Sequence, residues 1–376
     1  MKRLATIGIV FATMRLFGAP SVEITNVQQQ YPWTNTVDIT YTVSGITNKD
    51  YFVVFEAKDA DSNLLGAQTN VLETSGAGQT AQWEPPFNIR KLNCTMTPYV
   101  YRGGQDDYMI VDLETWDVTF EGIVGSQEDA NAKYTTNTVY KTSKMVFRKV
   151  EKGNYTIGCN DFTYDTQHSV AVPKDYYIAI FHCTVAQFDR INSGTKSTSM
   201  LPKDYISWIT IRGSAGVTAT PASGILATMN TKTGLAGFDL PTISMWEIAM
   251  RAGGTSKFIT GTTTAGIGDY IWYSGNTSSM QEVGLKKANA WGIYDTIGPC
   301  WDVPLDIYND GNLATLQPNA LVPITSGDAT RRFFVGPRIG FTSDGDNRLS
   351  PSYHASNAAN NSAAQHGFRL AYIPAE

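Results

Sequence analysis

Cysteine is scarce in this chain of 376 residues: the four cysteines are Cys94, Cys159, Cys183 and Cys300, and no two of them form a CxxC pair. A zinc knuckle or a thioredoxin-like redox motif is therefore excluded, because each needs such closely spaced pairs. Two alternatives stay open for the thiols. Cys159 and Cys183 could form a disulfide in oxidising surroundings, or all four could be isolated buried thiols.

Runs of lysine and arginine are also missing, and the formal net charge is −5. A nucleic-acid surface needs a basic stripe that releases phosphate counterions, so nucleic acid is not expected as a partner. Charged residues make up only 17% of the chain and hydrophobic residues 42%, with 33 glycines and 16 prolines. This composition is typical of a folded, loop-rich protein with β-structure, and the length predicts two domains.

Apolar runs of about 18 residues, the length that spans a bilayer, are absent from the sequence. The nearest approach is at the N-terminus, where Lys2 and Arg3 precede an apolar run over residues 4–14 and small residues follow. This pattern resembles a secretory signal peptide. We therefore expect a signal peptide at residues 1–19, no membrane span in the mature chain, and a protein that is secreted or held at the cell surface.

The segment VDITYTVS, residues 37–44, alternates strictly between apolar and polar residues. Alternation with a period of two predicts a half-buried antiparallel strand. Similar runs at residues 51–58 and 97–102 are separated by turn clusters, which predicts an antiparallel β-sandwich over residues 20–110. Residues 111–143 are polar and show neither periodicity, which indicates a linker.

Two later stretches carry the signals of a helix. In TVAQFDRIN, Thr184 precedes Gln187 by three residues, the spacing of a capping box. In LPTISMWEIAMRAGG, Ser244 and Glu247 have the same spacing, and Gly253 is placed to end the helix in the left-handed conformation. The rest of this region is rich in Gly, Asn, Ser and Thr, which predicts an irregular fold with few helices and little regular sheet.

Ordered sequence blocks in this second region resemble the formylglycine-generating enzyme (sulfatase-modifying factor) family, a variant of the C-type lectin fold. The blocks are MVFRKVEKGNYTIG (145–158), YYIAIFHCTVAQFDRIN (176–192), LPKDYISWITIRG (201–213), FDLPTISMWEIAMRAGG (238–254), YIWYSGNTSSMQEVGLKKANAWGIYDTIGPCWDVPLD (270–306) and HGFRLAYIP (366–374). The resemblance implies a formylglycine-generating-enzyme-like domain over residues 144–376. The expected fold is α+β, an N-terminal antiparallel β-sandwich followed by an irregular C-type-lectin-like domain; the sandwich also resembles modules found in bacterial surface proteins.

The same resemblance implies a calcium site in the loop GIYDTIGPCWD. Carried over position by position, Asp295 and Asp302 supply carboxylates, and Gly298 and Cys300 supply backbone carbonyl oxygens. Calcium accepts six to eight hard oxygen ligands of mixed origin, so the donor set is chemically sensible. The chain departs from the family in carrying Asp302 where Glu is usual, which retracts the carboxylate by one methylene. The alternative is that the two aspartates cap turns in a metal-free loop.

Enzymes of the family use two cysteines, with four residues between them, to bind copper and oxidise a substrate cysteine. In this chain those positions hold Phe341 and Asp346, and no cysteine follows Cys300, so copper is not expected as a cofactor. A related branch holds non-haem iron through histidines. His354 and His366 are either an unrecognised metal site of that kind or lone surface histidines.

The segment over residues 338–365 is polar and carries four anchors for a ligand: Phe341, Arg348, Tyr353 and His354. Aromatic and arginine side chains among Ser and Asn are typical of adaptable binding surfaces, and the alternative is an ordinary solvated loop. We therefore expect an exported, catalytically silent protein that binds a protein or glycan ligand here. Two other functions stay open: a metal-dependent oxidase with a divergent site, and a structural component of the cell surface.

Overall fold

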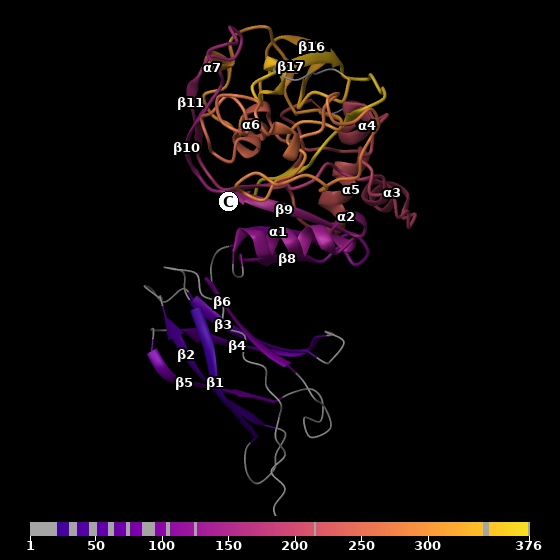
Figure 1. Ribbon diagram of the computed structural model, residues 1–376. Coiled ribbons are helices and arrows are strands. Elements are labelled where there is room, and N and C mark those ends of the chain that lie inside the picture. Colours follow the sequence, from indigo (N-terminus) through magenta and orange to yellow (C-terminus); the bar gives the residue numbers. More distant parts are fainter. Residues whose placement is uncertain are drawn as a thin grey trace, which may run out of the picture. The chain divides into compact units, whose positions relative to one another are not determined.

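The computed structural model describes the chain in segments, and Figure 1 traces them. The described segments are residues 21–29, 36–44, 51–58, 64–72, 76–84, 95–102, 106–123, 126–213, 216–340 and 346–374. The signal peptide expected at residues 1–19 lies outside these segments, as do Cys94 and Phe341. The chain divides into two compact units, Met1–Gln105 with Gly122–Asp129, and Asp106–Glu121 with Ala130–Glu376.

The smaller unit contains two antiparallel sheets of three strands each. The first sheet has the order β1-β2-β5 and is formed by β1 (Ser21–Gln29), β2 (Val37–Ser44) and β5 (Gly76–Trp83). The second has the order β4-β3-β6 and is formed by β4 (Leu64–Leu72), β3 (Tyr51–Lys58) and β6 (Thr95–Arg102). Residues of both sheets share one hydrophobic core. The expected antiparallel sandwich is therefore confirmed.

Strand β2 shows why the sequence pattern predicted this arrangement. Its apolar residues Val37, Ile39, Tyr41 and Val43 are buried, and the polar residues between them are not. Successive side chains of a strand point to opposite faces, so strict alternation gives one face to the core and one to solvent. Across the core, the ring of Tyr41 lies 5.0 Å from that of Phe55 on the other sheet.

The larger unit is built on a six-stranded antiparallel sheet with the strand order β13-β19-β12-β9-β7-β8. Its strands are β7 (Tyr108–Asp112), β8 (Val118–Glu121), β9 (Lys144–Val150), β12 (Tyr176–Ala179), β13 (Phe238–Asp239) and β19 (Ala371–Tyr372). Strand β19, near the C-terminus, lies between β13 and β12 and pairs with both. The two ends of this unit's sequence therefore meet in one sheet.

Residues 111–143 are not the linker that their polar composition indicated. The segment contains β8, and it also contains the helices α1 (Gln127–Thr136) and α2 (Val139–Thr142). Strand β7, which ends inside it, pairs with β9 and is almost wholly buried. The sequence shows no sign of helix α1 because this helix buries only Ala130 and Tyr134. Its sequence therefore lacks an apolar stripe with the helical period.

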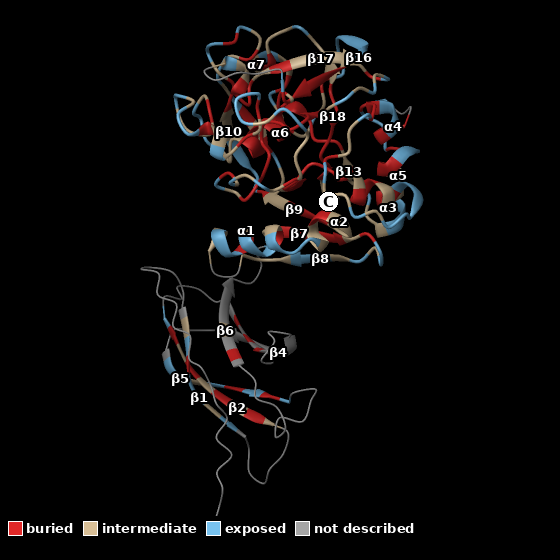
Figure 2. Cartoon of the chain, turned by 45° about the vertical axis from the view of Figure 1, so that its right-hand side comes forward, coloured by how far each residue is buried: buried red, intermediate tan, exposed pale blue. Residues whose placement is uncertain are grey.

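A second sheet lies at the end of the larger unit away from β8 and β9, as Figures 1 and 2 show for β16 and β17. Its strands are β14 (Trp301–Asp302), β15 (Ile307–Tyr308), β16 (Asp328–Val335), β17 (His354–Ala358) and β18 (His366–Gly367). Strand β16 pairs with β14, β15 and β17, and β14 also pairs in parallel with β18. A separate hairpin pairs β10 (Gly153–Ile157) with β11 (His168–Val172).

The remaining helices are short. They are α3 (Val185–Ser193), α4 (Trp208–Arg212), α5 (Gly224–Thr233), α6 (Ile243–Met250), α7 (Leu313–Leu316) and the 3-10 turns η2 (Ile267–Asp269) and η3 (Asn347–Leu349). Helix α3 begins with the predicted capping box: Thr184 Oγ1 accepts from Gln187 N at 3.1 Å, and Gln187 Oε1 accepts from Thr184 N at 3.0 Å. Within the described segments, no helix is long and apolar enough to cross a membrane.

The N-cap of helix α6 lies two residues before the predicted one. Thr242, not Ser244, is the N-cap, and its hydroxyl accepts from Met245 N. All of α6 is buried, and Figure 2 shows it inside the unit, so Ser244 and Glu247 bond to neighbouring segments instead of to the helix end. Gly253 adopts the predicted left-handed conformation with φ of +71°, and its N–H donates to Ile248 O.

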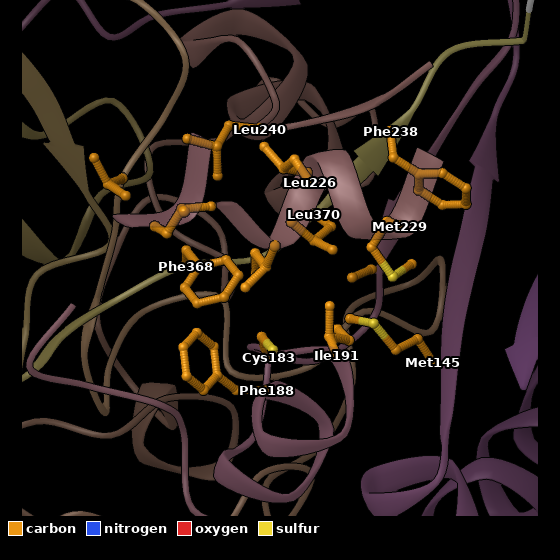
Figure 3. Packing of buried hydrophobic residues seen from close by; sticks show 14 of the residues in the cluster. Met145, Cys183, Phe188, Ile191, Leu226, Met229, Phe238, Leu240, Phe368 and Leu370 are labelled. Atoms are coloured by element: carbon orange, nitrogen blue, oxygen red, sulfur yellow. The ribbon is translucent and has the colours of Figure 1, made fainter. Parts of the chain in front are cut away.

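The main core of the larger unit combines side chains of the six-stranded sheet with those of α3, α4 and α5. Figure 3 shows part of it, with Phe188 and Ile191 of α3, Leu226 and Met229 of α5, and Phe368 nearby. Each such fully buried side chain contributes about 1.5–3 kcal/mol relative to an exposed one. This core fixes the C-terminal segment that carries the central arginine of the site.

Candidate functional site

Asp302, a predicted calcium ligand, lies on β14 in a buried polar network. Its Oδ2 accepts from Arg369 Nε at 2.7 Å and from Trp246 Nε1 at 2.8 Å. Its Oδ1 lies 3.3 Å from His182 Nε2. Burial of the imidazole, together with the charge of Arg369, lowers the pKa of His182 to about 4 despite the carboxylate beside it. At neutral pH the histidine of this network is therefore uncharged.

Asp295 is also buried, but it faces a different set of groups. Its backbone adopts φ of +51°, and its Oδ2 accepts from Gly284 N at 2.8 Å. Its Oδ1 is buried without a hydrogen-bond partner among the described residues. Burial raises the pKa of this carboxyl to about 6, and the bond from Gly284 opposes the rise. The Asp295 side chain thus ties the loop around residue 295 to the backbone of Gly284.

Gly298 and Cys300 serve the packing of the same loop. Gly298 has φ of +63°, and a Cβ there would lie 2.1 Å from the carbonyl oxygen of Trp272, so no side chain fits. Cys300 is fully buried, and its Sγ would lie 2.5 Å from a Cβ added to Gly367 on β18. Burial raises the pKa of the Cys300 thiol well above its usual value. This thiol is therefore a packed, neutral group.

The residues of this loop do not fit a calcium ion held by Asp302. The Arg369 guanidinium bonds to the Asp302 carboxylate, and it also donates to the carbonyl oxygen of Asp295 at 3.0 Å. A second cation sharing these oxygens would be repelled by the arginine at close range. Arg369 thus places one positive charge beside the Asp302 carboxylate and the Asp295 carbonyl oxygen.

His354 and His366 lie on opposite faces of β16 and are not a pair. His354 packs against Phe333 with ring centroids 4.9 Å apart, and His366 packs against Phe334 at 4.6 Å. Because consecutive residues of a strand point to opposite faces, imidazoles that pack on Phe333 and Phe334 are separated by the sheet. The hypothesis that these two histidines form a metal site is wrong.

The two positions that hold the family's catalytic cysteines carry other chemistry in this chain. Phe341 lies outside the described residues. Asp346 is the N-cap of η3, where its Oδ1 accepts from Arg348 N at 2.9 Å. Cys159 and Cys183 are both free thiols, so the disulfide considered between them is not formed. Burial raises the pKa of the Cys183 thiol, which is neutral at physiological pH.

The other predicted ligand-binding residues differ in how far they are exposed to solvent. Arg348 is partly exposed, and its guanidinium pairs with Asp346. Tyr353 is half-buried and stacks on Trp301 with ring centroids 6.3 Å apart. His354 is buried between Phe333 and Tyr164, and burial lowers its pKa to about 4. His354 is therefore part of the core and not a contact residue, because its strand turns it away from the surface.

A buried acid pair anchors the segment around Tyr353. Glu247 Oε1 accepts from Ser352 Oγ at 2.7 Å and from Arg251 Nε at 2.7 Å. Although burial alone raises the pKa of Glu247, Arg251 and these hydrogen bonds outweigh it and lower the pKa. Burial and the neighbouring Glu247 raise the pKa of Asp165 to about 10. At neutral pH the pair therefore carries one negative charge and one proton, which resides on Asp165.

An exposed apolar surface lies beside residues 359–365. Tyr205 is 64% exposed, Ile209 41% and Leu201 37%. The N–H of Tyr205 donates to Ala363 O at 3.2 Å, and that of Ile209 donates to Ala359 O at 3.3 Å. We call Tyr205 and Ile209, together with residues 359–365, the Tyr205 surface; Leu201 precedes Tyr205 in the chain by four residues.

Sequence reasoning missed the Tyr205 surface, although LPKDYISWITIRG was among the blocks compared. Tyr205 has φ of +50°, which is uncommon for a residue with a bulky side chain and costs about 1–3 kcal/mol. Such strain persists where the surrounding structure enforces it, and it is concentrated at functional sites. No pattern of spacing reveals a backbone angle, so the sequence held no signal for it.

The fold and the site together define an α+β protein with an irregular domain centred on a buried arginine–carboxylate network. The model of the family described as sulfatase-modifying factor enzyme 1-like domain matches residues 130–373, more than half of the chain. The chain therefore belongs to this family. The match begins at Ala130, inside the segment that was expected to be a linker.

Two solved structures are similar to this chain. One is described as Treponema denticola variable protein 1; it has 18% sequence identity and a TM-score of 0.49, and the match covers 61% of this chain and 96% of that one. The other is the crystal structure of CarF, with 14% identity and a TM-score of 0.42, covering 61% of this chain and 97% of that one. A comparison with curated proteins gave no match.

Proposed function

We propose that the chain is an exported protein whose sulfatase-modifying-factor-like domain binds a protein ligand without catalysis, and that the Tyr205 surface makes the contact. The observation that carries this proposal is the exposure of Tyr205 and Ile209, whose backbone N–H groups donate to Ala363 O and Ala359 O. Exposed aromatic and aliphatic side chains gathered on one face are typical of protein interaction sites. A glycan is the alternative ligand, since a tyrosine ring also stacks on sugars.

The partly exposed residues Tyr353 and Arg348 extend this surface through Trp301. The N–H of Trp301 donates to Gln365 O at 2.9 Å, and its indole stacks on Tyr353. The acid pair below, through Ser352, holds the backbone of the same segment. A binding surface supported by buried hydrogen bonds loses less conformational entropy when its ligand binds.

Catalytic silence is supported by the side chains that stand at the family's catalytic positions. Asp346 caps η3, and the thiols of Cys183 and Cys300 are buried with raised pKa values, so neither offers a thiolate to copper or to a substrate. Export is supported by the basic residues and apolar run at residues 1–14. Fractionation of the native host tests export, and oxygen consumption with a cysteine-containing peptide tests silence.

The binding proposal is tested with an array of cell-surface proteins and glycans probed with the purified full chain and with two variants. Tyr205→Gly removes the ring and also the strain of the left-handed backbone, so it should not lower the melting temperature. Leu285→Ala removes another exposed apolar side chain, 56% exposed, as a control. We expect a protein ligand whose affinity falls about tenfold or more in Tyr205→Gly and stays unchanged in Leu285→Ala. A ligand bound equally by all three proteins would place the site elsewhere.

A further inference from the structure

The larger unit also contains a pocket, and none of the residues that line it belongs to the Tyr205 surface. Its volume is about 500 Å³, and it is lined by the β7–β8 turn, the end of α3 and one side of α5. Figure 1 shows α3 and α5 beside each other. This volume is in the range of small-molecule sites. The side chains that line it are unusually polar for a pocket that borders the main core.

Positive charge dominates the pocket. Arg190, Lys196 and Lys232 line it together with one acidic residue, Glu114. Glu114 lies 3.4 Å from Lys196 Nζ and 3.7 Å from Arg190 Nε, so its charge is shared between two cations. Lys232 has no ion-pair partner among the described residues. The pocket therefore carries a net positive charge in a chain whose formal net charge is −5, which favours an anionic occupant.

Arg190 is built into the pocket and is not a mobile surface side chain. Its side chain is only 9% exposed, and its Nη1 donates to Ala186 O and to Ser197 O. Its Nε is buried and has no hydrogen-bond partner within the described part of the chain. This nitrogen lies 3.7 Å from Glu114 Oε1 without a hydrogen bond to it. A buried guanidinium nitrogen that lacks a hydrogen bond is costly, so a ligand oxygen that accepts from it would be bound favourably.

Trp116 gives the pocket an aromatic wall. It is half-buried against the main core, and it adopts φ of +69°, which a tryptophan rarely does. The turn that holds it is tightly bonded: Trp116 N donates to Asp112 O at 2.7 Å, and Asp112 Oδ1 accepts from Glu114 N at 2.9 Å. The strained backbone thus presents the indole to the pocket at a fixed angle.

We propose that this pocket binds an acidic saccharide, a sugar that carries a carboxylate or a sulfate. The indole of Trp116 stacks on the apolar face of a sugar ring, and the three cations bind its anionic group. Glu114, 42% exposed, accepts hydrogen bonds from sugar hydroxyls. An inorganic anion would use the cations but neither Glu114 nor the indole, and a neutral sugar would leave the charges unused. The combination of all three features favours the acidic sugar.

The proposal is tested by calorimetric titration of the full chain at low ionic strength with three hexasaccharides. One alternates glucuronate with N-acetylglucosamine, one contains only N-acetylglucosamine and is neutral, and one is sulfated. We expect at least one of the two acidic probes to bind at least tenfold more tightly than the neutral one. Inorganic sulfate at the same ionic strength should not displace it. Binding of neither acidic probe, or equal binding of the neutral one, would overturn the proposal.

Two charge reversals then locate the site. Lys232→Glu should weaken binding of the acidic hexasaccharide about tenfold or more, because it replaces an attractive contact with a repulsive one. Lys152→Glu makes the same change in net charge at an exposed lysine of the β9–β10 turn, outside the pocket, and should leave the affinity unchanged. Equal losses in both variants would show that binding is a non-specific effect of charge. Tyr205→Gly should not affect binding of the acidic hexasaccharide. The experiments can therefore contradict the proposal for the pocket and the proposal for the Tyr205 surface independently.

Discussion

Asp165 shows how a single buried residue contributes to the pH dependence of stability. In the unfolded chain its carboxyl ionises with the usual pKa near 3.8, whereas in the folded protein burial and Glu247 raise the pKa to about 10. Between these values the folded state binds one more proton at this position than the unfolded state does. Stability contributed by Asp165 is therefore greatest below about pH 4 and falls as the pH rises towards 10.

Replacing Asp165 by asparagine should remove this dependence. The amide has the shape of the protonated acid and is likewise neutral, but it has no proton to lose. We expect Asp165→Asn to raise the free energy of unfolding by roughly 1–3 kcal/mol at pH 8, with the gain vanishing near pH 4. Urea unfolding at both pH values measures it, and Asp310→Asn, at an exposed position, is the control. A difference that is the same at both pH values would contradict the assignment of the proton to Asp165.

At the scale of the element, helix α3 depends on one hydroxyl for two contacts. Thr184 Oγ1 accepts from Gln187 N within the capping box and also donates to Lys141 O at 2.8 Å, which ties the start of α3 to α2. Both bonds are buried. The end of a helix leaves backbone N–H groups without partners, so a cap that also bonds to a neighbouring element orders both at once.

Substitution of this cap should therefore destabilise the larger unit. We expect Thr184→Ala to lower the free energy of unfolding by about 1–2 kcal/mol, because it leaves Gln187 N and Lys141 O without their partner. Thr184→Ser keeps the hydroxyl and should lose less than half as much. Chemical denaturation followed by tryptophan fluorescence compares the two variants. Equal losses would mean that the methyl group, and not the cap, carries the effect.

At the scale of the whole molecule, the boundary of the larger unit lies before β7. Strand β7 pairs with β8 on one side and β9 on the other, and Met109 and Val111 are fully buried. A chain that begins at residue 144 would lose these strands and leave an edge of the sheet and part of the core open to water. Exposed strand edges and apolar surface of this kind promote aggregation.

Two fragments test this boundary. We expect residues 106–376 to fold on their own, with one cooperative thermal transition and the near-ultraviolet circular dichroism of packed aromatic side chains. Residues 144–376 should be recovered mainly as aggregate, or should unfold at least 10 °C lower, because burial of two strands stabilises the sheet by several kcal/mol. Equal stability of the two fragments would show that β7 and β8 are dispensable and would restore residues 111–143 to the role of a linker.

The sequence by itself determined the features whose cause is local. Alternation over residues 37–44 predicted β2, the spacing of Thr184 and Gln187 predicted the cap of α3, and the ordered blocks predicted the family that the comparison then showed. Each depends on neighbours within a few residues or on the order of short motifs, and both are visible in a linear chain.

Only the tertiary structure decided what the charged and aromatic residues do. The carboxylate of Asp302 accepts a hydrogen bond from Arg369, 67 positions away. His354 and His366 pack on opposite faces of β16, and the backbone N–H of the exposed Tyr205 is bound by Ala363 O. The role of a carboxylate, an imidazole or a ring is set by the groups it meets and by the water it loses. Those groups come from distant segments, and no local pattern specifies them.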